Sequence, residues 1–238
     1  HLWTLGPAVL IVVVAISLCV GPDGFQIGGE LWGLRAHRVA LAVIIGGGLS
    51  MTGAALQMLL CNPLADPYII GVSGGAALGG ALALSTGAVA MAWVWGGSIA
   101  GAAVATLGLG FLFGRGPQRA EMNGILLMGV ALNAFAGAII TILKTLVSAE
   151  RTQSMLFWLV GTLAYPSTEE VIWLLFSVAV GGIVLLRLAG PLDLLQLGDD
   201  EACRLGIDAP SCKRLIFLAC SVIVGACVAS AGLIGFVG

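Results

Sequence analysis

Seven long apolar segments dominate the sequence, and none of them contains Asp, Glu, Lys, Arg or His. A helix of about 20 apolar residues crosses the hydrocarbon core of a bilayer, and lipid admits only helices or closed barrels as spanning structures. We therefore predict an all-α fold, a polytopic transmembrane helix bundle that forms a single domain over residues 1–238. The predicted spans are residues 3–20, 39–61, 69–89, 91–113, 122–143, 171–186 and 215–238.

The composition supports a membrane protein and excludes other classes. Hydrophobic residues make up 59% of the chain and charged residues only 9%, whereas roughly a quarter of the residues of a soluble domain are charged. The net charge is −2 and only two Lys are present, so no basic surface for nucleic acid is expected. The six Cys form no CxxC pair, and we expect them to be packing residues rather than metal ligands.

Loops between successive spans alternate between the two faces of the membrane, so their basic residues can be counted by face. Six Lys and Arg fall on one face and four on the other. The positive-inside rule assigns the first face to the cytoplasm, with residues 21–38, a turn near residue 90 and residues 144–170 outside. The cytoplasmic set is Arg115, Arg119, Arg187, Arg204, Lys213 and Arg214, and the outer set is Arg35, Arg38, Lys144 and Arg151.

The lack of charge inside the spans narrows the kind of membrane protein. Ion-coupled transporters and pumps use ionisable groups within the membrane, and a haem subunit needs axial ligands, but the only imidazoles are His1 and His37, outside the spans. No G-x-x-x-x-G-K-[ST] motif is present, so ATP would have to be bound and hydrolysed by a partner. A transport subunit with no catalytic residues fits best. A secondary transporter and a structural membrane anchor of a larger complex are the alternatives.

Two arginines, Arg35 and Arg38, stand on the outer side just before the second predicted span. They oppose the positive-inside bias, and a guanidinium at a helix start is unfavourable in the field of the helix dipole. An acidic surface on a partner protein would compensate for this charge. The alternative is that both side chains reach lipid phosphates at the membrane interface.

Residues 190–212 form a cytoplasmic segment that is too polar to span the membrane and too apolar for a solvated loop. Acidic residues after Gly198 favour a helix start and Gly206 favours its end. Within Leu192–Ile207 we therefore predict a short amphipathic helix between Gly198 and Gly206, and a surface that docks on a partner with Leu195, Leu197, Leu205 and Ile207 exposed. The alternative is a helix that lies on the inner membrane surface. The residues assigned to docking are Leu197, Gly198, Asp199, Asp200, Glu201, Leu205 and Gly206.

A stripe of small and polar residues recurs every four positions in the fifth predicted span. This spacing places the residues on one face of the helix. The stripe either lines a water-filled pathway or forms a close helix contact of the small-xxx-small type, and the residues alone leave both open. Its members are Gly129, Asn133, Gly137, Thr141 and Thr145.

Turn residues and glycines punctuate the middle of the chain. Asn62-Pro63 and Asp66-Pro67 mark a turn after the second span, and we expect Asp66 to cap a helix whose first residue is Pro67. Glycines at four-residue spacing leave one face of the third and fourth spans bare, so we expect these two helices to pack closely. These glycines are Gly71, Gly75 and Gly79 in one span and Gly97 and Gly101 in the next.

In this order, these residues resemble the FecCD-type permease subunits of ABC importers for iron siderophores, haem and cobalamin. The most specific part is the run Asn62 to Pro67, followed by Gly71 to Ala76. The resemblance covers nearly the whole chain. Further matches are the Arg35–Arg38 pair, Gln57, Trp158 with Gly161, the segment Leu197–Gly206 and the end Gly232–Gly238.

The resemblance implies a ten-helix permease of which this chain holds about seven spans, with C-terminal helices missing. It implies a homodimer or pseudo-dimer in the bacterial inner membrane, two cytoplasmic ATPases that bind ATP and Mg, and a periplasmic or lipid-anchored substrate-binding protein. No cofactor is expected on this chain itself. The substrate would be a bulky metal chelate, and we favour an iron siderophore over haem or cobalamin because that substrate is the most abundant in the family.

The resemblance also assigns roles to the candidate sites. It places Arg35 and Arg38 at the binding protein, the stripe at the translocation pathway and the 190–212 segment at the ATPase. The family usually has Pro between the paired arginines, where this chain has His37. We expect this difference to alter the local turn and not the charges.

Overall fold

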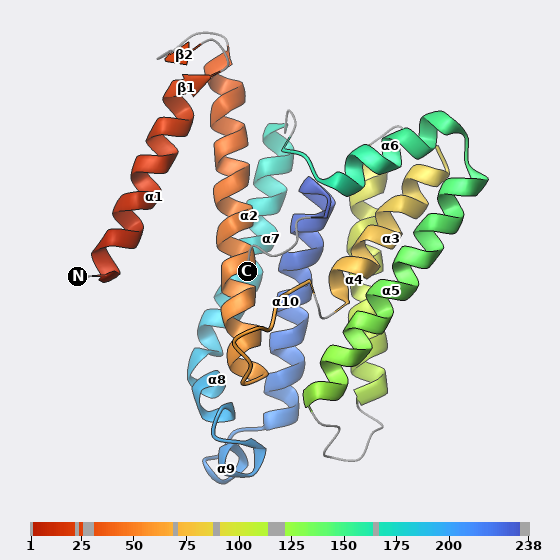
Figure 1. Ribbon diagram of the computed structural model, residues 1–238. Coiled ribbons are helices and arrows are strands. Elements are labelled where there is room, and N and C mark those ends of the chain that lie inside the picture. The colour runs from red at the N-terminus through yellow and green to blue at the C-terminus, as the bar shows by residue number, and fades with distance from the viewer. Residues whose placement is uncertain are drawn as a thin grey trace.

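The computed structural model describes residues 2–21, 24–25, 31–68, 71–87, 91–113, 122–163 and 167–233. Within them the fold is all-α as predicted, apart from one hairpin of two-residue strands in which Val20 pairs with Phe25. Figure 1 shows the helices as a bundle with α1 set apart beside α2. The elements are α1 (Leu2–Cys19), β1 (Val20–Gly21), β2 (Gly24–Phe25), α2 (Leu31–Leu59), α3 (Val72–Ser85), α4 (Met91–Phe113), α5 (Met122–Leu146), α6 (Ala149–Val160), α7 (Thr168–Arg187), α8 (Ala189–Leu195), α9 (Asp199–Arg204) and α10 (Ala209–Ala231).

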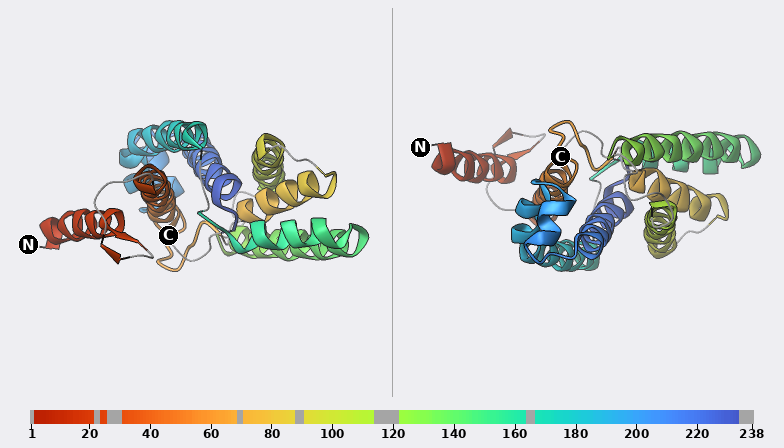
Figure 2. Two further views of the ribbon diagram at one scale, coloured as in Figure 1. Left: turned by 90° about the horizontal axis from the view of Figure 1, so that it is seen from above. Right: turned by 90° about the horizontal axis from the view of Figure 1, so that it is seen from below.

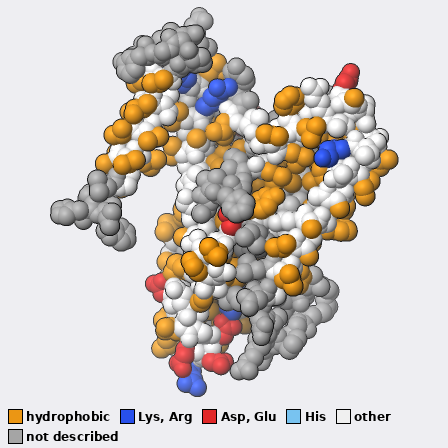
Figure 3. Space-filling view, viewed as in Figure 1, with side chains coloured by type: hydrophobic (Ala, Val, Ile, Leu, Met, Phe, Trp, Pro, Cys, Tyr) orange, Lys and Arg blue, Asp and Glu red, His pale blue; other side chains and the backbone are white. Residues whose placement is uncertain are grey.

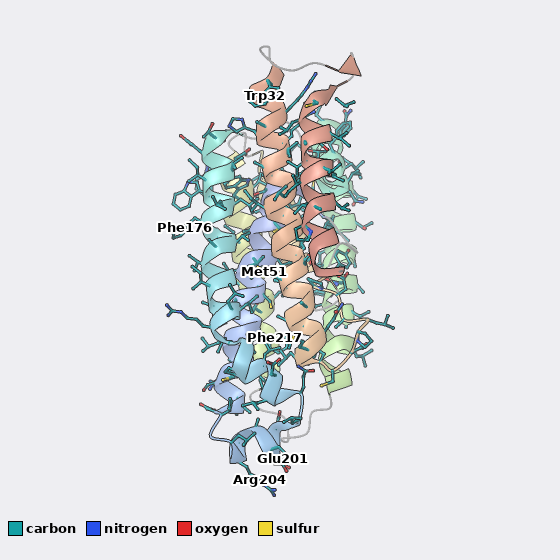
Figure 4. All side chains as sticks on the ribbon, turned by 90° about the vertical axis from the view of Figure 1, so that its left-hand side faces the viewer. Trp32, Met51, Phe176, Glu201, Arg204 and Phe217 are labelled. Carbon is teal, nitrogen blue, oxygen red and sulfur yellow. The ribbon has the colours of Figure 1, made fainter. Side chains whose placement is uncertain are left out.

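The bundle has two ends, which we name the α6 end and the α9 end after the short helices that lie there (Figure 1). Trp32 lies at the α6 end, and Glu201 and Arg204 lie at the α9 end (Figure 4). The long helices run alternately from one end to the other (Figure 1), as the sequence predicts. On the face drawn in Figure 3, most charged side chains gather toward the two ends and apolar side chains cover much of the middle, the arrangement that suits a bilayer.

Helix α10 lies at the centre of the packing. It contacts α2, α3, α4 and α7, and 67% of its most apolar stretch is buried inside the bundle. Glycines let its neighbours approach, since a Cβ on Gly181 of α7 would lie 2.5 Å from Ile223 and one on Gly48 of α2 would lie 2.9 Å from it. Between α10 and α4 the buried Thr106 hydroxyl donates to Ser221 Oγ at 2.6 Å.

The predicted close packing of the glycine faces is confirmed between α3 and α4. A Cβ at Gly75 would lie 2.6 Å from the carbonyl oxygen of Gly101, and one at Gly79 would collide with the carbonyl oxygen of Gly97. Only glycine permits these backbones to meet. Because lipid is as apolar as the helices, close packing of this kind replaces the hydrophobic effect as the force that holds membrane helices together.

All seven predicted spans coincide with helices, but the helices differ in length. Of the described residues, four helices are long and apolar enough to cross a membrane, namely Trp32–Leu59, Leu127–Leu146, Thr168–Arg187 and Ala209–Ala231. The apolar parts at Gly6–Cys19, Val72–Ser85 and Ala92–Gly108 are shorter. Helix α3, with 14 residues, extends only about 21 Å, because the described residues 60–68 before it are not helical.

Several predicted boundaries were wrong. The second span begins at Leu31 rather than at residue 39, so Arg35, His37 and Arg38 lie inside α2 and not in a turn before it. The predicted outer loop 144–170 contains α6. The last helix ends at Ala231, because Gly232 takes a φ of 79° and turns the chain, and residues 234–238 of the predicted span lie outside the described residues.

Candidate functional sites

The turn between α2 and α3 is closed by its own side chains. Asn62 Oδ1 accepts a hydrogen bond from the Leu64 N–H at 2.9 Å, and Asp66 Oδ1 accepts one from the Tyr68 N–H at 2.6 Å. Both are the side-chain-to-backbone turns that Asn and Asp favour, and they precede Pro63 and Pro67 respectively. The prediction that Asp66 caps a helix beginning at Pro67 is therefore wrong, since its carboxylate closes a turn instead.

Helix α3 begins at Val72, and its cap comes from another helix. Its N-cap residue Gly71 has a φ of 86° and no side chain to offer. The Asn133 side chain of α5 replaces it: Oδ1 accepts from the Gly74 N–H at 3.0 Å, and Nδ2 donates to the Tyr68 carbonyl at 2.7 Å. The third N–H of a helix is the group that an N-cap side chain normally satisfies, so Asn133 ties α5 to the start of α3.

The stripe on α5 thus divides into two environments. Gly129 is buried against Gly71, whose Cβ would lie 3.0 Å from the Gly129 carbonyl oxygen, and Asn133 is half-buried. Gly137 and Thr141 are exposed, and a Cβ on Gly137 would meet nothing within 4 Å. The Thr141 hydroxyl donates back to the Gly137 carbonyl at 2.9 Å. The first half forms the close helix contact given as the alternative, and the second half faces open space in the single chain.

The arginine pair lies in the first turns of α2 at the α6 end. Arg35 is partly buried, and its Nη2 atom is enclosed with no hydrogen-bond partner among the described residues. Arg38 is exposed. Between them, His37 is within hydrogen-bonding distance of the Gly33 carbonyl, at 2.7 Å, and of Thr168 Oγ1 of α7, at 3.0 Å. His37 therefore joins α2 to α7 rather than changing a turn.

The segment between α7 and α10 contains the short helix predicted between Gly198 and Gly206, which is α9, and a further helix, α8, that was not predicted. Gly198, with a φ of 107°, separates them, and Gly206, with a φ of 87°, ends the second. Leu197 and Leu205 are exposed, at 64% and 59%. Leu195, expected on the exposed face, is 5% exposed and packs into the core instead.

One ion pair joins this segment to the start of α10, and a second lies within α9. Lys213 Nζ lies 2.7 Å from the Asp199 carboxylate, and Arg204 lies 3.2 Å from Glu201 within α9. Asp208 caps α10 by accepting from the Ser211 N–H at 3.4 Å. Hydrogen bonds from Ser211 lower the pKa of Asp208, so the stabilisation by this cap is fully present above the ordinary pKa of a carboxyl group and is lost as the pH falls through the lowered pKa.

The candidate sites do not converge on one place. The arginine pair lies at the α6 end, α8 and α9 lie at the opposite end, and the α5 stripe runs between the ends (Figure 1). In the described part of the chain, no three His, Cys, Asp or Glu side chains group in a way that could hold a metal ion.

Residues 8–238 match the model of the FecCD transport family. The chain belongs to this family. Among its relatives, the cobalamin import system permease protein BtuC of Halobacterium salinarum is 35% identical over 205 residues, which cover 86% of this chain and 55% of that protein. The Fe(3+) dicitrate transport system permease protein FecC of Escherichia coli is 34% identical, over 86% of this chain and 62% of its own length.

A further relative and a solved structure extend the comparison. The vitamin B12 import system permease protein BtuC of Salmonella paratyphi A is 32% identical, over 99% of this chain and 74% of that protein. A solved structure described as an inward-facing conformation of a metal-chelate type ABC transporter superposes with a TM-score of 0.86 at 29% identity, over 97% of this chain and 75% of the other. The chain therefore spans about half to three-quarters of the length of these relatives.

Two features of this FecCD chain were missed from the sequence. Helix α6 was missed because its apolar residues alternate with Glu150, Arg151 and Gln153, and a search for apolar runs does not detect an amphipathic helix. The cap supplied by Asn133 has no local signature, because donor and acceptor are 59 residues apart. The signal that was available at Asn133 was an amide in an otherwise apolar span, which requires a partner there.

Proposed function

We propose that the chain is the membrane permease subunit of an ABC importer that carries a metal chelate across the cytoplasmic membrane, with hydrolysis of ATP by a partner subunit. The observation that carries this proposal is the similarity, over nearly the whole chain, to FecCD permeases and to a metal-chelate type ABC transporter structure at a TM-score of 0.86. In this proposal the chain binds no cofactor, and ATP and Mg bind in the partner.

The α9 end is the proposed contact with the ATPases. Leu197 and Leu205 are exposed there beyond the membrane helices, and the positive φ values at Gly198 and Gly206 fix the direction in which they project. The segment 190–212 would fit a groove on each of two ATPase subunits, with Leu205 buried in the partner. Asp199, Asp200 and Glu201 in the first turn of α9 stabilise that helix through its dipole.

The α6 end is the proposed contact with the substrate-binding protein. Arg38 is exposed on α2 at that end, and Arg35 has an enclosed guanidinium nitrogen with no partner among the described residues. An acidic side chain on a periplasmic or lipid-anchored binding protein would satisfy such a group. Charge complementarity of this kind raises the rate of association.

The exposed half of the α5 stripe is the proposed wall of the pathway. Gly137 and Thr141 have open space beside them and present a small polar surface, which a second permease copy would convert into a closed path. Gly129 and Asn133 support this wall by fixing α5 on α3. Among chelates we propose an iron siderophore as the substrate. The relatives named for Fe(3+) dicitrate and for cobalamin make these two the chelate classes to compare.

Uptake by proteoliposomes tests the proposal. The full-length permease, purified together with its ATPase and loaded with ATP, should take up radioiron–siderophore from its binding protein and should not do so without ATP. Cobalamin, supplied with the same components, is the competing substrate. Uptake that persists without ATP but depends on a proton gradient would contradict an ABC mechanism and indicate a secondary transporter, and co-purification with a redox subunit alone would indicate a membrane anchor.

A further inference from the structure

An apolar groove runs along the outside of α3, between α4 and α5. Its volume is about 1130 Å³. Helices α4 and α5 both pack on α3, which lies between them (Figure 2), and the groove forms where they diverge. The floor is made by Gly71, just before α3, and by residues of α3 from Gly75 to Ala83, and the walls include Gly96, Ala100 and Val104 of α4 and Leu132 and Phe135 of α5.

The groove matches the shape of a lipid chain. It follows α3 from Gly71 to Gly87, a length of about 21 Å for the 14 helical residues, which exceeds the roughly 15 Å of hydrocarbon in one leaflet. Its walls expose large apolar side chains, with Trp93 and Val104 at 71% and Phe135 at 64%. A single acyl chain can therefore lie in it along its full length.

A cation stands at the end of the groove that opens toward the membrane surface. The groove ends at Thr86 and Gly87, and a Cβ placed on Gly87 would lie 2.9 Å from Nη2 of Arg151. Arg151 donates from Nη1 to the Ser85 carbonyl at 2.9 Å, and none of the ion pairs among the described residues includes it. Its guanidinium is thus held beside the groove with donors still available.

The level of this cation is that of lipid headgroups. Trp93, in the first turn of α4, lies at the same end of the groove and is 71% exposed. Tryptophan concentrates where the hydrocarbon of a membrane meets the headgroups. The cation and the tryptophan therefore mark the depth at which a phospholipid carries its phosphate, and the groove extends from there into the hydrocarbon.

We propose that one phospholipid binds in this groove, with an acyl chain between α4 and α5 and its phosphate at Arg151. Arg151 forms charge-assisted hydrogen bonds to the phosphate, and the acyl chain of the lipid covers the glycine-rich contact between α3 and α4. The lipid is a structural ligand of the permease and not its transported substrate. The proposal of a lipid site does not depend on which chelate the permease carries.

Native mass spectrometry of the full-length permease complex, purified in mild detergent, tests the site. Gly96→Leu fills the groove without a clash, because a Cβ on Gly96 meets nothing within 4 Å, and it should abolish the retained phospholipid. Ala100→Leu, at a second exposed position in the wall, should do the same. Gly108→Leu is the matched control, since Gly108 is equally open and outside the groove, and it should retain the lipid.

Arg151→Gln tests the headgroup contact separately and should weaken retention about tenfold, the usual effect of losing a charge-assisted hydrogen bond. Equal lipid retention in wild type and in both groove variants would overturn the proposal, as would equal loss in the Gly108→Leu control. A Gly96→Cys variant gives a further outcome. Disulfide cross-linking between two copies through Cys at this position would show that a second permease chain, and not lipid, occupies the groove.

Discussion

Leu205 offers the sharpest test of the proposed ATPase contact. Its side chain is 59% exposed at the end of α9, so it contributes little to the fold of the chain alone. Complete burial of a leucine is worth about 1.5–3 kcal/mol, and a partner that covers the exposed part would gain about 1–2 kcal/mol from it. Leu205→Ala should therefore weaken ATPase binding about fivefold to thirtyfold. Leu205→Asp should cost on the order of 2 kcal/mol or more, because it puts a charge into a desolvated contact.

The assay compares the two activities of the complex in proteoliposomes. With Leu205→Asp, substrate and binding protein should no longer stimulate ATP hydrolysis and uptake should stop, while the permease still inserts and its thermal unfolding stays within about 0.5 kcal/mol of wild type. Leu205→Met keeps the volume and apolar character and should restore both activities. Wild-type stimulation and uptake in the Asp variant would refute the placement of this side chain in the ATPase contact.

Three further predictions follow from other sites. Exchange of both Arg35 and Arg38 for Glu should raise the Kd for the binding protein and flatten its salt dependence; an unchanged Kd at low salt would leave them as lipid anchors. Gly206→Ala should lower the free energy of unfolding by about 1–2 kcal/mol, because Gly206 has a positive φ. Gly190→Ala is the control, since Gly190 also has open space beside it but no positive φ, and equal melting temperatures of the two variants would contradict the prediction. Asn133→Leu should lower the free energy of unfolding by about 1–3 kcal/mol, because it leaves two backbone groups without a hydrogen-bond partner. Asn133→Asp should have an intermediate effect because it keeps only the acceptor, and thermal unfolding of both variants in detergent measures the difference.

The membrane spans could be predicted from the sequence because charge is excluded from lipid. The residues at which the helices begin and end could not always be predicted. Arg35 and Arg38 stopped the apolar run, so the start of α2 at Leu31 was missed even though a helix can continue into the headgroup region. The start of α7, by contrast, has a local sequence signal. Ser167 and Glu170 form a capping box, with bonds of 3.2 Å and 3.0 Å, and the serine-to-glutamate spacing signals this motif.

The candidate sites were predictable as residue types and less so as contacts. The four-residue spacing of the α5 stripe predicts that its members share one face, but nothing local shows that α3 begins beside Asn133 and that only part of the stripe is covered. Leu195 illustrates the same limit in α8. An apolar residue in a short polar segment reads as exposed, whereas the turn at Gly198 divides the segment and returns Leu195 to the core.

The magnitudes show how the α8–α9 segment would pass motion to the membrane helices. The ion pair between Lys213 and Asp199 joins α9 to α10, but its side chains are 26% and 52% exposed, and exposed pairs contribute about 0–1 kcal/mol. Leu192 and Leu195 of α8 are only 3% and 5% exposed, and α8 contacts α2, α7 and α10. Each buried leucine is worth more than the ion pair. In the proposed ATPase contact, a displacement imposed at Leu205 would therefore reach the bundle mainly through the apolar base of α8, and the charges of α9 would set the orientation of that helix toward the partner.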